Sequence, residues 1–156
     1  MKNIYCFVFI ALAGLFITKA QNPDEIQWKT WPELEQALKK EPKPVFIFFH
    51  ADWCVYCKKI ERVVFNKLAV IQKINKNYYA VEMNVESTDT ITFDTVEFKN
   101  TQARTQRNSV HEIALLLASR KGQPFSLPAT LILNEDFTVK KRIFEYYTAQ
   151  QLLKVL

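Results

Sequence analysis

Two cysteines that stand two residues apart, Cys54 and Cys57, are the residues of this sequence best suited to chemistry. They follow an apolar run, Val45 to Phe49, and precede a helical pattern, which predicts a buried strand leading into a helix. A sulfur at a helix N-terminus meets unpaired backbone N–H groups and the positive end of the helix dipole, so the thiolate is favoured there. Cys57 falls one turn later, within the reach of a disulfide. The spacing therefore predicts a redox dithiol with Cys54 as the candidate nucleophile and Cys57 as the resolving cysteine.

This stretch resembles the active site of the thioredoxin superfamily. The string from Ala51 to Lys58, with Trp53 before the first cysteine, is especially similar to the C-terminal thioredoxin-like domain of DsbD-type thiol:disulfide interchange proteins. The resemblance covers most of the chain after about Trp28. It implies an α/β, three-layer thioredoxin-like fold, with a central mixed sheet flanked by helices and an insertion before a cis-proline loop. Pro128 resembles that cis-proline, and Leu127 would pair its backbone with a bound peptide.

The same resemblance assigns roles to the neighbours of the cysteines. Trp53 would pack over the site and contact substrate, together with the proline loop. Val55 and Tyr56 would tune the redox potential; the valine matches the DsbD-type domain and the tyrosine departs from it. His50 could tune the thiolate from four residues before Cys54, or it could simply pack or face solvent.

The resolving cysteine needs a proton acceptor, and the family usually supplies an acid on the strand beneath the cysteines. The corresponding residue here is Phe48, which cannot accept a proton. Glu61 lies four residues after Cys57, on the same helix face, and the DsbD-type domain also carries a glutamate at that spacing. Glu61 is therefore the candidate replacement, with a surface glutamate paired to Lys58 or Arg62 as the alternative.

Positions 1–20 predict a secretory signal peptide. Lys2 gives a positive start, and the apolar stretch from Ile4 to Ile17 is shorter than the roughly 20 residues that span a bilayer, so cleavage is favoured over an anchor. Cys6 would be lost with the signal. Residues 21–156 would then form one thioredoxin-like domain, exported to the periplasm or secreted, with no stable membrane insertion after cleavage.

Composition narrows the functional classes. The net charge of +5 comes from basic residues scattered among acidic ones, which argues against a nucleic-acid partner. Two glycines in the whole chain exclude a glycine-rich phosphate loop. A single cysteine pair in an exported domain of this size favours catalysis over a structural staple. We expect no cofactor besides the redox-active cysteine pair, and as partners protein disulfides or dithiols and an upstream thiol electron donor.

Two other functional classes stay open at this stage. A thioredoxin-fold binding module, with vestigial cysteines and a gripping segment at Glu86–Arg107, is favoured by the missing acid at Phe48. A zinc site would combine the two cysteines with His50 and His111, although strong zinc patterns bring a second close pair. The Glu86–Arg107 segment alternates at Ile91 to Phe98 as two short strands would, but we favour an ordinary surface excursion.

The remaining pattern predicts elements typical of the same fold. They are a helix from Trp31 with a capping box at Thr30 and Glu33, a helix from Cys54, a further helical segment over Leu68 to Ile74, a strand over Tyr78–Val85, a helix from Asn108 or Ser109 to about Ser119 with Leu116 facing inward, a strand hairpin over Leu127–Leu133 and Thr138–Phe144, and a last helix capped by Thr148.

Overall fold

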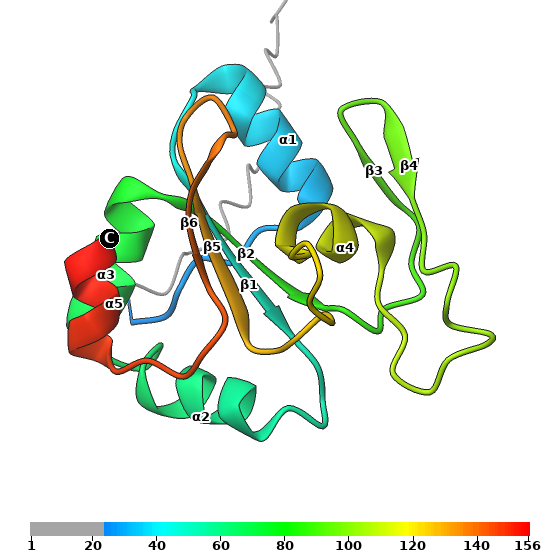
Figure 1. Cartoon of the computed structure of the whole chain (residues 1–156). Coiled ribbons are helices and arrows are strands. Elements are labelled where there is room, and N and C mark those ends of the chain that lie inside the picture. Colours follow the sequence, from blue (N-terminus) through cyan, green and yellow to red (C-terminus); the bar gives the residue numbers. More distant parts are fainter. Residues whose placement is uncertain (1–23) are drawn as a thin grey trace, which may run out of the picture.

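The computed structural model describes residues 24–156, so the expected signal peptide at positions 1–20 lies outside the described residues. The chain forms an α/β structure around a four-stranded mixed sheet (Figure 1). In chain order its elements are α1 (Trp31–Lys40), β1 (Val45–His50), α2 (Val55–Val63), α3 (Leu68–Asn77), β2 (Tyr79–Asn84), β3 (Ile91–Phe93), β4 (Val96–Phe98), α4 (Glu112–Ala118), β5 (Ala129–Leu133), β6 (Val139–Ile143) and α5 (Ala149–Val155).

The strands of the large sheet lie in the order β2-β1-β5-β6, with β1 parallel to β2 and antiparallel to β5, and β5 antiparallel to β6. The centre of the sheet is apolar on both faces, since Val45 to Phe49 of β1 and all of β5 are buried. Helices lie on both sides of it, and α3 packs beside α5 (Figure 1). This arrangement confirms the predicted three-layer fold and places the end of β1 next to the start of β5.

Capping signals in the sequence locate the starts of α1 and α5. Thr30 and Glu33 form the predicted capping box of α1, and Thr148 forms another with Gln151 at α5. Within residues 24–156, no helix combines the length and apolar character needed to cross a membrane.

The preference for a plain surface excursion at Glu86–Arg107 was wrong, because β3 and β4 pair as an antiparallel hairpin. The turn between them places Asp94 and Thr95 at positive φ, without the Asn-Gly signature that usually announces such a turn. Phe93 of β3 packs edge-on against Trp31 of α1, with ring centroids 5.5 Å apart, and lies against Phe137 at 5.2 Å. The hairpin is therefore fixed against the body of the domain.

The predicted start of the next helix was also wrong. α4 begins at Glu112 with His111 as its N-cap, whose Nδ1 accepts the Ile113 N–H, and not with Asn108 or Ser109. The Ser109 hydroxyl instead accepts a hydrogen bond from Asn100, which holds the loop before the helix. Leu116, expected to face inward, is 65% exposed, because α4 buries the face that carries Ile113, Ala114 and Ala118.

Candidate active site

Cys54 and Cys57 are joined by a disulfide at the N-terminus of α2. Cys54 is the N-cap of the helix, and its Sγ accepts the N–H of Cys57 at 3.2 Å. The buried strand β1 ends shortly before Cys54 and so fixes where α2 begins. At this N-cap a sulfur takes the place of the oxygen that a capping side chain usually provides. Cys54 is 4% exposed and Cys57 is fully buried, so the first sulfur is the one nearer to solvent. This geometry can stabilise a Cys54 thiolate in the reduced protein.

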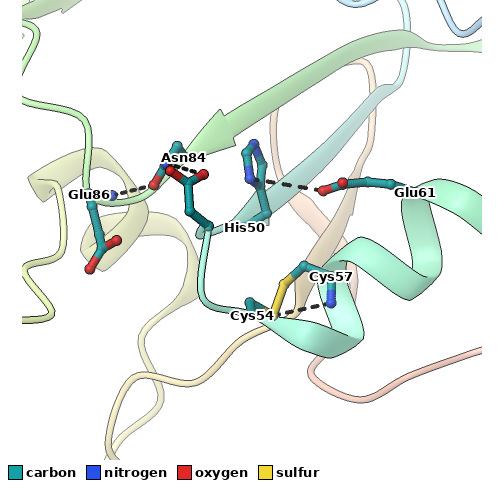
Figure 2. Close-up of polar contacts among 7 residues, drawn as sticks. His50, Cys54, Cys57, Glu61, Asn84 and Glu86 are labelled. Atoms are coloured by element: carbon teal, nitrogen blue, oxygen red, sulfur yellow. Dashed lines mark hydrogen bonds and ion pairs between the residues drawn. A yellow bond between two sulfur atoms is a disulfide. The ribbon is translucent and has the colours of Figure 1, made fainter.

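A chain of polar contacts ties the loop before Cys54 to the end of β2. The indole Nε1 of Trp53 donates to Glu86 Oε1 at 3.0 Å. Figure 2 shows that the Glu86 N–H in turn donates to Asn84 Oδ1, and the Asn84 amide donates to an oxygen of Asp52 at 3.2 Å. Trp53 therefore stands at a fixed place beside the nucleophile while remaining half exposed.

Glu61 lies on α2 but pairs with neither Lys58 nor Arg62. Its Oε1 lies 3.9 Å from His50 Nδ1, and Figure 2 shows its carboxylate directed toward that imidazole. Burial lowers the pKa of His50, while the negative charges of Glu61 and Asp52 act in the opposite direction. The predicted stand-in acid and the histidine thus form one cluster beside the cysteines.

The position of the missing family acid is filled by aromatic packing. Phe48 is fully buried, its ring stacks on His50 at 5.9 Å, and it meets Phe65 edge-on at 4.9 Å. Directly across the parallel pairing of β1 and β2, Glu82 stands opposite Phe48. Partial burial raises the pKa of Glu82, and the charge of Glu61 raises it further.

Glu61 and Glu82 share an open cavity of about 290 Å³, which is wide enough for water. Its other lining residues are Glu25, Ile26, Trp28, Phe65 and Asn66. Glu82 was not among the predicted site residues, although a single acid between Val81 and Met83 in a largely apolar strand could have indicated it.

Val55 and Tyr56, the two residues between the cysteines, are both exposed. The Tyr56 ring lies 6.3 Å from that of Tyr146, which precedes α5, and the Lys59 ammonium stands 4.6 Å above the Tyr146 ring. An apolar surface with a cationic border therefore adjoins the disulfide.

The Leu127–Pro128 peptide bond is cis, as the resemblance implied. Ala129, the next residue, pairs with Phe49 near the end of β1, which puts the proline loop at the same end of the sheet as the cysteine loop. Among the described residues, the backbone N–H and C=O of Leu127 take part in no hydrogen bond.

The zinc alternative finds no cluster to support it. The described residues contain no group of three or more His, Cys, Asp or Glu side chains that could hold a metal. His111 has both ring nitrogens engaged, since Nδ1 accepts from Ile113 and Nε2 contacts the Asp89 carbonyl at 3.0 Å.

A dithiol motif at a helix N-terminus beside a cis-proline loop defines the thioredoxin class of fold, and comparison with known proteins agrees. A family model described as thioredoxin-like matches residues 27–111, and the chain belongs to this family. The thiol:disulfide interchange protein DsbD of Escherichia coli K12 is 41% identical over 64 residues, which cover 40% of this chain and 11% of that protein. DsbD of Pectobacterium atrosepticum is 41% identical over 44 residues, covering 28% and 8% of the two chains. The matched segments thus span about a tenth of these relatives.

Solved structures support the fold. A thioredoxin from Thermus thermophilus superposes with a TM-score of 0.58 at 16% identity, covering 83% of both chains. A structure described as DsbH oxidoreductase gives a TM-score of 0.54 at 22% identity, covering 84% of this chain and 82% of the other. A putative disulphide-isomerase from Bacteroides thetaiotaomicron gives 0.55 at 21% identity, covering 86% and 92%.

Proposed function

We propose that this protein is a thiol:disulfide oxidoreductase that reduces protein disulfides through the Cys54–Cys57 dithiol. The observation that carries the proposal is the placement of Cys54 as the N-cap of α2, where it accepts the Cys57 N–H. Membership of the thioredoxin-like family and the partial similarity to DsbD support the same chemistry.

The reaction begins with the reduced protein. The Cys54 thiolate attacks one sulfur of the substrate disulfide; the second substrate sulfur leaves as a thiolate and takes up a proton, and a mixed disulfide remains. Cys57 then loses its proton and attacks the Cys54 sulfur, which releases the first substrate sulfur as a thiolate. Two electrons pass to the substrate, and the Cys54–Cys57 disulfide forms. A dithiol donor must reduce this disulfide before the next cycle.

Glu61 is the proposed acceptor of the Cys57 proton. It lies one turn along α2 from Cys57, and the position where the family carries its acid is occupied by Phe48. The open cavity shared with Glu82 would give the proton a route toward solvent, and the His50 imidazole lies 3.9 Å from the Glu61 carboxylate. In this role Glu61 acts on a reacting atom, whereas His50 is a charged or polar neighbour of Glu61.

The substrate would lie along the exposed surface around the disulfide. Trp53, Val55 and Tyr56 offer apolar contacts, while Leu127 offers its free backbone next to Pro128. We further propose that the protein works outside the cytoplasm, in the periplasm or secreted, because residues 1–20 have the pattern of a signal peptide.

Two cysteine substitutions test the reaction in an assay that follows reduction of insulin by the dithiothreitol-reduced, then desalted, protein. Cys54→Ser should abolish turnover. Cys57→Ser should trap a mixed disulfide through Cys54, visible as an added substrate mass in non-reducing mass spectrometry. Wild-type turnover in either variant would overturn the dithiol mechanism. Absence of any turnover or trapping, with a native circular dichroism spectrum, would favour a thioredoxin-fold binding module.

A further inference from the structure

The insertion between β2 and α4 forms a cleft beside the nucleophile. The cleft has a volume of about 460 Å³ and is lined by Trp53, Glu86, Arg107 and Asn108; we call it the Trp53–Arg107 cleft. Trp53 directly precedes Cys54, so the cleft adjoins the loop that carries this cysteine.

The far wall of the cleft is held in place by hydrogen bonds at the base of the insertion. The His111 N–H donates to the Val85 carbonyl at 2.8 Å, which closes the loop at its two ends. Within the loop, the Asn100 amide donates to the Ser87 carbonyl and to the Ser109 hydroxyl at 3.1 and 3.0 Å. The insertion thus presents Arg107 from a fixed loop.

The charged groups around the cleft differ in whether they have hydrogen-bond or ion-pair partners. Glu86 accepts the Trp53 indole N–H, and Asp52 accepts an N–H of the Asn84 amide. The guanidinium of Arg107, in contrast, is exposed and has no hydrogen-bond or ion-pair partner among the described residues. Exposed cations also lie on α2, at Lys58, Lys59 and Arg62. An unpaired guanidinium is suited to a carboxylate, which it can bind through two N–H groups.

We propose that the Trp53–Arg107 cleft is a specificity subsite that takes an acidic side chain flanking the substrate disulfide. The proposal rests on the proposed function and narrows its substrates to proteins with Asp or Glu next to the reactive cysteine. Trp53 would contact the peptide, and Arg107 would pair with the carboxylate. Arg107 is here a specificity residue outside the exchange chemistry.

The test compares two disulfide-bonded peptides that differ only in a Glu or a Gln beside the cysteine. At low salt, the wild-type protein should reduce the Glu peptide about two- to fivefold faster in kcat/KM, the effect of one exposed ion pair, and 0.5 M NaCl should remove the difference. Arg107→Gln should abolish the preference and Arg107→Glu should reverse it. Arg104→Gln, an exposed arginine of the same insertion that does not line the cleft, is the matched control and should keep it.

A second measurement tests the proposed subsite separately from the proposed redox reaction. The same peptides with serine in place of cysteine are titrated into the oxidised protein, and the Trp53 indole N–H signal is followed by NMR. The Glu peptide should shift this signal at lower concentration than the Gln peptide, whether or not the protein turns over. Equal titrations, or equal kcat/KM values with both peptides reduced, would overturn the subsite while leaving the redox function intact. Lack of reduction with a clear binding preference would overturn the redox function alone.

Discussion

Replacing Glu61 by Gln should change two measurable quantities at once, the pKa of His50 and the rate at which Cys57 resolves a mixed disulfide. The carboxylate lies 3.9 Å from His50 Nδ1. At that distance two unit charges interact by about 1 kcal/mol in bulk water and about 4 kcal/mol at an effective dielectric constant of 20. Both side chains are partly exposed, at 21% and 38%, so the lower figure applies and is reduced further by salt.

Losing this attraction, worth about 0.5–1 kcal/mol, should lower the pKa of His50. The direction follows from the charges. Burial lowers the pKa of His50, and the negative charges of Glu61 and Asp52 oppose this effect, with Glu61 contributing more than Asp52. Asp52→Asn removes the second one and should lower the pKa by a smaller amount. The ranking of the two variants is therefore part of the prediction.

The assay is an NMR pH titration of the imidazole signals in the oxidised protein. The full chain has two histidines, His50 and His111, so each imidazole signal is first assigned to its residue. An unchanged or raised His50 pKa in Glu61→Gln, or a larger effect of Asp52→Asn, would refute the pairing.

The kinetic half of the prediction uses stopped-flow resolution of a preformed mixed disulfide at Cys54. Glu61→Gln should slow resolution near neutral pH, and raising the pH should restore the rate because Cys57 then ionises without an acceptor. A structural role alone would not produce a pH-dependent rescue. Overlapping rate–pH profiles for wild type and variant would show that Glu61 does not accept the Cys57 proton and is an ordinary surface residue.

Two further predictions concern stability, measured by urea unfolding. Tyr147→Phe leaves the buried Thr130 hydroxyl without its 2.8 Å partner and should lower the free energy of unfolding by about 1–3 kcal/mol. Tyr146→Phe is the control and should change it little, since the Tyr146 hydroxyl has no hydrogen bond to the described residues. Equal effects of the two substitutions would contradict this account. His111→Ala removes the N-cap acceptor of α4 and the contact to the Asp89 carbonyl, and should lower the free energy of unfolding by about 1–3 kcal/mol. It should also speed amide hydrogen exchange across the insertion. Exchange as slow as in the wild type would show that other contacts hold the insertion.

Much of the fold was predictable because its signals are local. The apolar run of β1, the capping box at Thr30 and the cysteine spacing each involve neighbours within one or two turns. The alternation at Ile91 to Phe98 indicated the hairpin β3–β4, but a surface excursion was favoured because the turn at Asp94 and Thr95 has positive φ without a glycine.

The composition of the site was less predictable because its partners are distant in sequence. Glu61 was identified from helix spacing, but its pairing with His50 depends on how α2 lies against β1. Glu82 reaches the same cavity from β2, through a register that a sequence pattern does not reveal. Arg107 comes beside Trp53 only when the insertion closes, which no periodicity predicts.

Backbone hydrogen bonds at the end of β1 connect the insertion to the strand that carries the cysteine loop. The Val85 N–H donates to the His50 carbonyl at 2.9 Å, and the Val85 carbonyl accepts the His111 N–H. The cysteine loop directly follows the end of β1. Val85, which is hydrogen-bonded to that same strand end, also holds the end of the insertion. In the reaction proposed here, the reactive sulfurs depend on the buried sheet and α2, whereas substrate choice depends on the exposed insertion. Substitutions on the exposed insertion surface, such as Arg107→Gln, can then change the substrate without changing the exchange chemistry.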